Sequence, residues 1–180
     1  MDDCKSRPST VLEESVDEVR LVGEIGHQVD NRQLYLAVVH DLPKWSPDLS
    51  VVRAPFSVFT ALDVKPHDMN TLEAFGARLI VAGCRDVSSW GLHADDIHLA
   101  VDNAFIRIVP KVEWDDKFVG TTSAEDEFNE ALNAALFTFG TEWDSFLAIT
   151  SPEYAEQLER SLSNVLQWHR DVFGYDVYIS

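Results

Sequence analysis

The sequence has few cysteines, few basic residues and no long apolar run, and each shortage excludes a class of protein. Cys4 and Cys84 are the only two cysteines among 180 residues. We expect two free thiols in a reducing compartment, because a disulfide framework or a cysteine-ligated metal site needs more cysteines at closer spacing. No segment reaches the ~20 apolar residues of a membrane-spanning helix. The first residues are acidic where a signal peptide is basic, so we expect a cytoplasmic protein.

Basic residues are scarce beside acidic ones. The 31 Asp and Glu residues against 14 Lys and Arg residues give a formal net charge of −17. A protein that binds the phosphate backbone directly normally carries a basic stripe, so direct nucleic-acid binding is disfavoured. Two explanations of the acidity stay open, namely solubility and attraction of a basic partner.

The glycine-rich motifs of common catalytic sites are also missing. The chain contains neither G-x-G-x-x-G nor a P-loop, and it lacks the G-x-S-x-G of α/β hydrolases. Because backbone N–H groups in such loops bind phosphate, their absence argues against a nucleotide. We expect no cofactor.

The sequence does contain a repeated order of strand, polar cap, amphipathic helix and glycine. The clearest copy runs from Asn70 to Gly91. Asn70 and Glu73 form a capping-box pattern, apolar residues follow at helical spacing, and Gly83 suits the left-handed residue that ends a helix. A buried strand over 85–89 is expected to follow.

The same spacing rules predict the remaining elements. Strands are predicted over 33–39 and 145–150, a weak edge strand near 21–25, a strand or short helix over 57–64, a short strand before 122 and a last strand over 175–180. Helices are predicted over 93–109, over 123–139 from a capping box at Ser123, and over 152–172.

This alternation predicts an α/β fold, a three-layer α/β/α sandwich around a mainly parallel sheet of about four to six strands. We expect residues 1–18 to form an acidic flexible tail and residues 19–180 a single α/β domain.

Polar residues follow several of the predicted strands. Ligands bind parallel sheets at the carboxyl ends of the strands, so these residues suggest a rim site. The alternative function is therefore a small-molecule enzyme or sensor that uses His40, Asp41, His93 and Thr121. Serine, threonine and aspartate at such positions also serve as helix caps and loop pairs, which is the structural explanation.

A metal site is conceivable on the helix expected from His93. Asp95, His98 and Asp102 would share one face of that helix, but His93 and His98 would not. We interpret this segment as a solvated polar face and expect no metal.

Acidic residues gather between residues 113 and 130. The segment holds one basic residue, Lys117, and an aromatic residue beside its acids, as interface anchors often are. A helix starting at Ser123 would explain the later acids through its dipole, but not the earlier ones. We expect a surface for a basic partner, with these residues: Glu113, Trp114, Asp115, Asp116, Glu125, Asp126, Glu127 and Glu130.

The residues Gly83-Cys84-Arg85, followed by Trp90-Gly91 and Asp102, resemble a little-studied family of small bacterial α/β domains. The resemblance covers roughly residues 70–150. It implies the fold class and a bacterial origin, and it transfers no activity.

The acidity favours a non-catalytic binding protein. We expect an immunity protein or antitoxin that neutralises a basic, nucleic-acid-cleaving partner.

Overall fold

The computed structural model describes residues 18–26, 31–63, 69–124 and 127–177. Within these ranges a six-stranded sheet has the order β1-β2-β6-β3-β4-β5. Neighbouring strands are parallel except β1, which is antiparallel to β2. The strands are β1 (Val19–Gly26), β2 (Asn31–Val38), β3 (Phe56–Ala61), β4 (Cys84–Trp90), β5 (Gly120–Ala124) and β6 (Ser145–Thr150).

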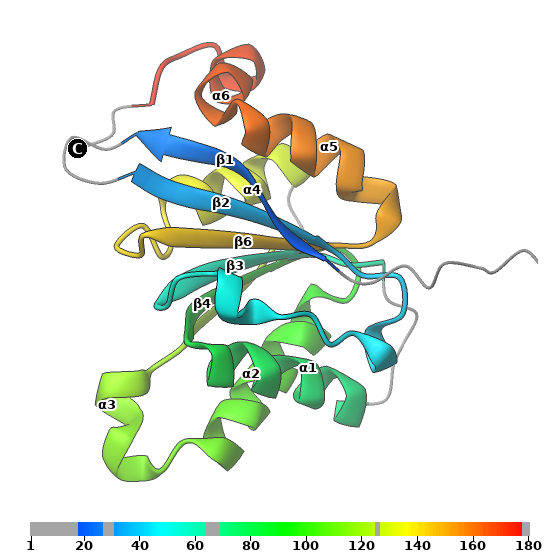
Figure 1. Ribbon diagram of the computed structural model, residues 1–180, viewed down its shortest axis with the longest axis vertical. Coiled ribbons are helices and arrows are strands. Elements are labelled where there is room, and N and C mark those ends of the chain that lie inside the picture. Colours follow the sequence, from blue (N-terminus) through cyan, green and yellow to red (C-terminus); the bar gives the residue numbers. More distant parts are fainter. Residues whose placement is uncertain (1–17, 27–30, 64–68, 125–126, 178–180) are drawn as a thin grey trace, which may run out of the picture.

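Helices cover both faces of this sheet (Figure 1). One layer consists of α1 (Met69–Ala82) and α2 (Ala94–Ile108), and the other of α4 (Phe128–Phe137), α5 (Pro152–Ser163) and α6 (Val165–Phe173). Short helical turns η1 (Leu42–Lys44), η2 (Leu49–Val51), η3 (Lys111–Glu113) and α3 (Trp114–Lys117) lie in the connections. The predicted α/β fold, with a mainly parallel sheet between two helical layers, is confirmed.

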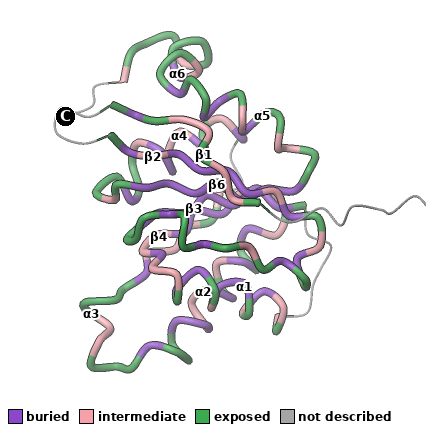
Figure 2. Tube along the Cα trace, in the orientation of Figure 1, coloured by how far each residue is buried: buried purple, intermediate pink, exposed green. Residues whose placement is uncertain are grey.

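The central strands β3 and β6 explain this layering. Every residue of both strands is buried, and successive side chains point to opposite faces of a sheet. Phe56 and Leu147 therefore join the core beneath α1 and α2, while Phe59 and Phe146 join the core beneath α4 and α5. Each fully buried side chain of this size contributes about 1.5 to 3 kcal/mol. Figure 2 shows the resulting buried centre and exposed periphery.

Most of the predicted elements are present. The strand over 33–39 is β2, the strand over 85–89 is β4, and the strand over 145–150 is β6. The segment 57–64, for which the sequence left a strand or a short helix open, contains strand β3. This strand pairs with β6 on one side and with β4 on the other. Gly83 follows α1 with a φ of 100°, as its predicted role in ending that helix requires.

The predicted helix start at Ser123 is wrong. Ser123 lies in β5 opposite Ser89 of β4, and α4 begins at Phe128 after Glu127. Pairing with β4 continues to Ala124, so the backbone is extended where the capping box would make it helical. Hydrogen bonding of residues 120–124 with β4, a strand distant in sequence, therefore outweighs the local preference for a helix cap at Ser123.

The predicted helix over 152–172 is broken in two. Asn164 has a φ of −146° and a ψ of 65°, which separates α5 from α6. The hydroxyl groups of Ser161 and Ser163 donate to the carbonyls of Gln157 and Glu159 in the last turns of α5. Such bonds compete with the helical backbone pattern and favour a bend.

The predicted last strand is not formed by residues 175–177, and residues 178–180 lie outside the described ranges. The described residues contain no helix that is long and apolar enough to cross a membrane.

A buried arginine ties the sheet to the end of α4. The Arg32 guanidinium donates to the carbonyls of Leu136 (2.7 Å) and Gly140 (2.9 Å) and to the Ser57 hydroxyl (2.6 Å). It also lies 5.3 Å from the centroid of the Phe146 ring. Burial lowers the pKa of Arg32 to about 10, with the charges of Asp86 and Glu142 acting in the opposite direction. The side chain therefore stays charged at neutral pH.

Replacing Arg32 should destabilise the protein strongly. The Arg32→Met variant leaves two buried carbonyls without their donor, so we expect the free energy of unfolding to fall by about 3 kcal/mol. Urea denaturation measures this. Arg53→Met is the matched control, because Arg53 is exposed and 3.6 Å from Asp144, and it should cost less than about 1 kcal/mol. Equal losses in both variants would contradict a special role for Arg32.

Candidate functional site

The connection between α2 and β5 projects from the body of the protein (Figure 1). Pro110 follows the end of α2 and cannot continue it, since proline has no N–H to donate. The chain then forms η3 and α3 before β5 begins at Gly120. We call residues 110–118 the α3 projection.

Aromatic packing and hydrogen bonding hold the α3 projection in shape. The Trp114 indole N–H donates to the Val109 carbonyl at 3.0 Å. The rings of Trp114 and Phe118 lie 6.0 and 6.3 Å from that of Phe105 in α2. Lys117 pairs with Glu113 across one turn at 2.5 Å. The projection is thus a preformed surface that pays little ordering entropy on binding.

The α3 projection combines apolar and acidic side chains. Val112 and Phe118 are 89% and 65% exposed. Asp115 and Asp116 are exposed as well, and in the described part of the chain neither forms an ion pair within 4.0 Å. Apolar groups beside uncompensated charge are typical of a binding surface whose centre is dry and whose rim is polar.

A groove adjoins the α3 projection. It has a volume of about 260 Å³ and lies between the end of α1 and the start of the projection. Val81 of α1 and Ile108 of α2 are among its lining residues and are exposed. Arg85 and Lys117 also line it. The groove extends the apolar surface of the projection.

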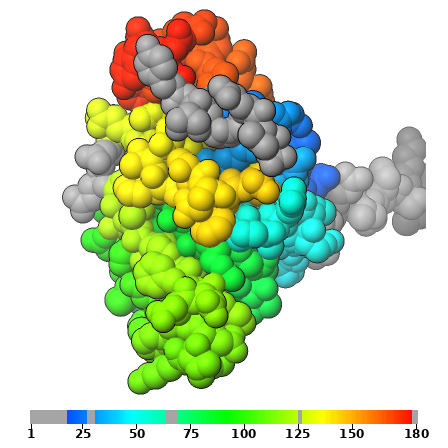
Figure 3. Space-filling view, turned by 90° about the vertical axis from the view of Figure 1, so that its left-hand side faces the viewer, coloured from blue at the N-terminus to red at the C-terminus, as the bar shows by residue number. Residues whose placement is uncertain are grey.

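The α3 projection and the α4–β6 connection (138–144) lie on the same face of the molecule (Figure 3). This face contains the amino ends of the parallel strands, because β5 begins directly after the projection and β6 directly after the connection. Gly140, with a φ of 57°, brings the connection close to the sheet, and a Cβ atom there would lie 2.7 Å from the Cβ of Ser57.

A partly buried carboxyl group lies at this end of the sheet. The pKa of Asp86 is raised to about 6, chiefly by burial and also by the nearby charge of Glu142, while Arg32 and a hydrogen bond with Ser88 act in the opposite direction. Two buried polar atoms nearby, Trp143 Nε1 in the connection and Ser145 Oγ at the start of β6, have no hydrogen-bond partner within the described part of the chain. Asp86 can therefore bind and release a proton near neutral pH.

The structure divides the predicted partner surface. Glu113, Trp114, Asp115 and Asp116 belong to the α3 projection, with Trp114 half-buried. Glu127 and Glu130 lie at the start of α4, beyond the other end of β5. Five strand residues at about 3.3 Å each separate the two groups. Glu125 and Asp126 lie outside the described residues.

The residues of the alternative rim site do not come together. His40 and His93 follow β2 and β4, which are three strand spacings apart, or about 14 Å. Asp41 pairs with Lys44 at 2.8 Å, and His93 Nδ1 lies 3.1 Å from Asp96.

Thr121 was expected to follow a strand, and that expectation is wrong. Thr121 is the second residue of β5, and its hydroxyl donates to Asp102 at 2.9 Å. His98 Nε2 lies 3.3 Å from the same carboxylate. Among the described residues no group of three or more His, Cys, Asp and Glu side chains could hold a metal.

Residues 31–164 match the family model for a domain of unknown function, DUF7684. The chain belongs to the DUF7684 family. The matched region runs from β2 to the break at Asn164, so it contains the Gly83 to Asp102 motif residues but excludes β1 and α6. No curated protein and no solved structure matches the chain. Membership in the DUF7684 family therefore brings no activity with it.

Sequence reasoning missed the apolar part of the surface on this DUF7684 domain. Phe118 was expected to enter a short strand, but it is exposed because β5 begins two residues later. The available signal was the presence of Val112 and Phe118 on either side of Asp115 and Asp116. Asp86 was also missed, because its burial depends on the α4–β6 connection and on Gly120.

The raised pKa of Asp86 predicts a specific pH dependence of stability. The folded state holds the Asp86 proton more tightly than the unfolded state, whose pKa is near the ordinary value of 3.8. The cost of ionising Asp86 in the folded state is therefore complete above about pH 6, shrinks as the pH falls below 6 and is gone below about 3.8. Asp86→Asn should be more stable than the wild type at pH 8 by about 1 kcal/mol, after allowance for partial exposure.

Urea denaturation between pH 4 and 8 measures the difference between the two proteins. We expect it to shrink toward pH 4. Glu142→Gln removes a like charge near Asp86. In a protein that carries this change, Asp86→Asn should therefore raise the stability at pH 7 by less than it does in the wild type. A difference that is constant over this pH range would contradict the raised pKa.

Proposed function

We propose that this protein is a non-catalytic acidic binding protein that neutralises a basic protein partner through its α3 projection. The finer form of the proposal is an immunity protein or antitoxin whose partner cleaves nucleic acid. The observation that carries it is the combination of exposed Val112 and Phe118 with Asp115 and Asp116 on a preformed projection.

The apolar side chains would supply the dry centre of the interface. Residues that dominate binding energy are typically large, central and shielded from water in the complex. Phe118 packs on Phe105 but is still 65% exposed in the protein alone. A partner can bury most of this exposed surface of the ring. The adjoining groove could receive an apolar side chain of the partner.

The acidic side chains would supply attraction and selectivity. The projection contains two cations: Lys117 pairs with Glu113, and Lys111 lies over the Trp114 ring. Asp115 and Asp116 form no ion pair among the described residues, so they can meet cations from outside. Proteins that bind the nucleic-acid backbone present Lys and Arg to phosphates, so an acidic surface complements their binding face. The net charge of −17 adds a long-range field that accelerates encounter with such a partner.

The placement of the alternative site favours binding over catalysis. His40, His93 and Thr121 lie on separate strands or at opposite ends of the sheet, so they could not act on one substrate atom. General acid–base catalysis needs such groups within hydrogen-bond reach of the reacting proton.

Charge reversal on the α3 projection should slow association. A basic partner is first recovered with the tagged protein from its native cells and purified. Stopped-flow association is then measured at ~50 and ~300 mM salt. Replacing both Asp115 and Asp116 by Lys should lower the association rate at least tenfold at low salt, with a smaller effect at high salt.

The matched control is the double change Glu153→Lys and Glu156→Lys. It alters the net charge equally but lies in α5, which starts at the carboxyl end of β6, away from the projection. It should change the rate much less. Equal slowing by the two double variants would show that net charge alone matters, and recovery of no basic partner would refute the proposal.

Removing the apolar side chain should speed dissociation instead. Phe118→Ser removes the ring that the partner would bury, so we expect the complex to dissociate at least tenfold faster with little change in association. Leu92→Ser is the control, because Leu92 is 91% exposed and lies before α2 at the other end of β4. An unchanged dissociation rate in Phe118→Ser would place the interface elsewhere.

A further inference from the structure

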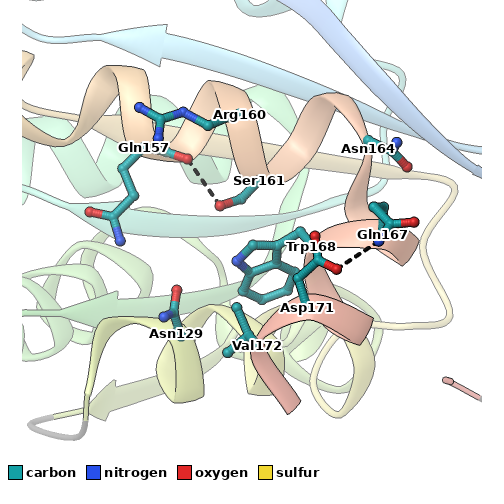
Figure 4. Close-up of a pocket in the computed structure, with 9 residues that line it drawn as sticks. All are labelled: Asn129, Gln157, Arg160, Ser161, Asn164, Gln167, Trp168, Asp171 and Val172. Atoms are coloured by element: carbon teal, nitrogen blue, oxygen red, sulfur yellow. Dashed lines mark hydrogen bonds between the residues drawn. The ribbon is translucent and has the colours of Figure 1, made fainter. Parts of the chain in front are cut away.

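A second surface feature lies far from the α3 projection, in the helical layer of α4, α5 and α6. It is a groove of about 410 Å³, within the range of small-molecule sites. The break at Asn164 creates it, because α6 turns away from the direction of α5 and leaves space beside α4 (Figure 4). This groove is independent of the proposed partner surface.

The groove is electrically neutral in a strongly acidic protein. Its lining includes one cation, Arg160, and one anion, Asp171. Arg160 is paired with Glu156 at 2.8 Å, and Asp171 accepts a hydrogen bond from Gln167 at 2.6 Å. Arg160 is therefore compensated by Glu156, whereas the Asp171 carboxylate is hydrogen-bonded but forms no ion pair within 4.0 Å among the described residues. An anionic ligand would find no free cation here, and a carboxylate can accept hydrogen bonds from hydroxyl groups, so the lining suits a neutral ligand that carries hydroxyl groups.

Carboxamide side chains dominate the polar lining. Asn129, Gln157 and Asn164 line the groove, and within the described part of the chain their side chains make no hydrogen bond. Each carboxamide offers two N–H donors and a carbonyl acceptor. Ligand groups that both donate and accept match this arrangement, and hydroxyl groups do so.

An aromatic ring forms the apolar part of the groove. Trp168 is half-buried, and its ring contacts Phe173 edge-on at 6.0 Å. Figure 4 shows the indole nitrogen of Trp168 facing the space between Gln157 and Asn129, with Val172 beside the ring. Tryptophan combines a large apolar surface with one polar N–H, so it can contact an apolar ligand face and a polar ligand edge together.

We propose that this groove binds a neutral saccharide. Such a ligand has an apolar C–H face for Trp168 and hydroxyl groups for the carboxamides of Asn129, Gln157 and Asn164. Its hydroxyl groups can also donate to the Asp171 carboxylate, and the side chains of Gln157 and Asn164 are exposed to solvent.

Saturation-transfer NMR on the full chain tests the proposal. The probes are glucose, galactose, mannose, N-acetylglucosamine, maltose and cellobiose. We expect signal transfer to at least one of them, with an affinity that is the same at ~50 and ~300 mM salt because the ligand is neutral. Gln157→Ala and Asn164→Ala change exposed side chains and should each weaken binding severalfold without loss of folding.

Changes at the aromatic ring separate stacking from folding. Trp168→Ala should abolish detectable binding, and Trp168→Phe should retain part of it. Trp114→Phe, a change in the α3 projection, should leave saccharide binding unaltered.

Three results would overturn the proposal. They are no transfer to any saccharide of the panel, transfer that persists unchanged in Gln157→Ala and Asn164→Ala, and binding of adenosine or a tetraalanine peptide at this groove in place of every saccharide.

Discussion

The buried guanidinium of Arg32 joins three parts of the chain that are distant in sequence. It is carried by β2 and donates to Ser57 of β3, to the end of α4 and to the connection that leads into β6. A buried charge is costly unless it is hydrogen-bonded, and the two terminal nitrogens of Arg32 make these bonds while Nε makes none among the described residues, so the bonds fix how the connection approaches the sheet. The positive charge of Arg32 also lowers the pKa of Asp86, against the larger effect of burial, which raises it. Arg32 therefore fixes the α4–β6 connection, which lies on the same face of the molecule as the α3 projection (Figure 3).

Two surfaces of opposite character follow from this architecture. The α3 projection places uncompensated carboxylates beside exposed apolar groups and is held rigid by the packing of Trp114 and Phe118 on Phe105. The groove between α4, α5 and α6 instead presents carboxamide side chains beside Trp168, and among the described residues these side chains make no hydrogen bond. Both arise where a helix ends, at Pro110 in the first case and at Asn164 in the second. Loops and helix ends on a rigid scaffold are where binding sites usually lie.

The sequence predicts the parts of this fold that depend on local pattern. The continuous apolar runs of β2 and β6 indicate strands buried on both faces, and Gly83 marks the end of α1. It fails where distant contacts decide. Ser123 carries a cap signal but is drawn into β5 by its pairing with β4, and this moves the start of α4 to Phe128. The acids of the candidate surface were identified, but the separation of Glu127 and Glu130 from the projection by β5 could not be read from spacing along the chain. The groove at Trp168 could not be predicted either, since it depends on the bend at Asn164.

The claim that the α3 projection is the partner surface can be tested most directly by hydrogen–deuterium exchange. Amide exchange is measured for the protein alone and in complex with the basic partner recovered in the pull-down. Amides buried by a partner exchange more slowly, so the account predicts slower exchange in residues 110–118 and at the end of α1, and no change in α5 and α6. Slower exchange confined to other segments, with residues 110–118 unchanged, would contradict it.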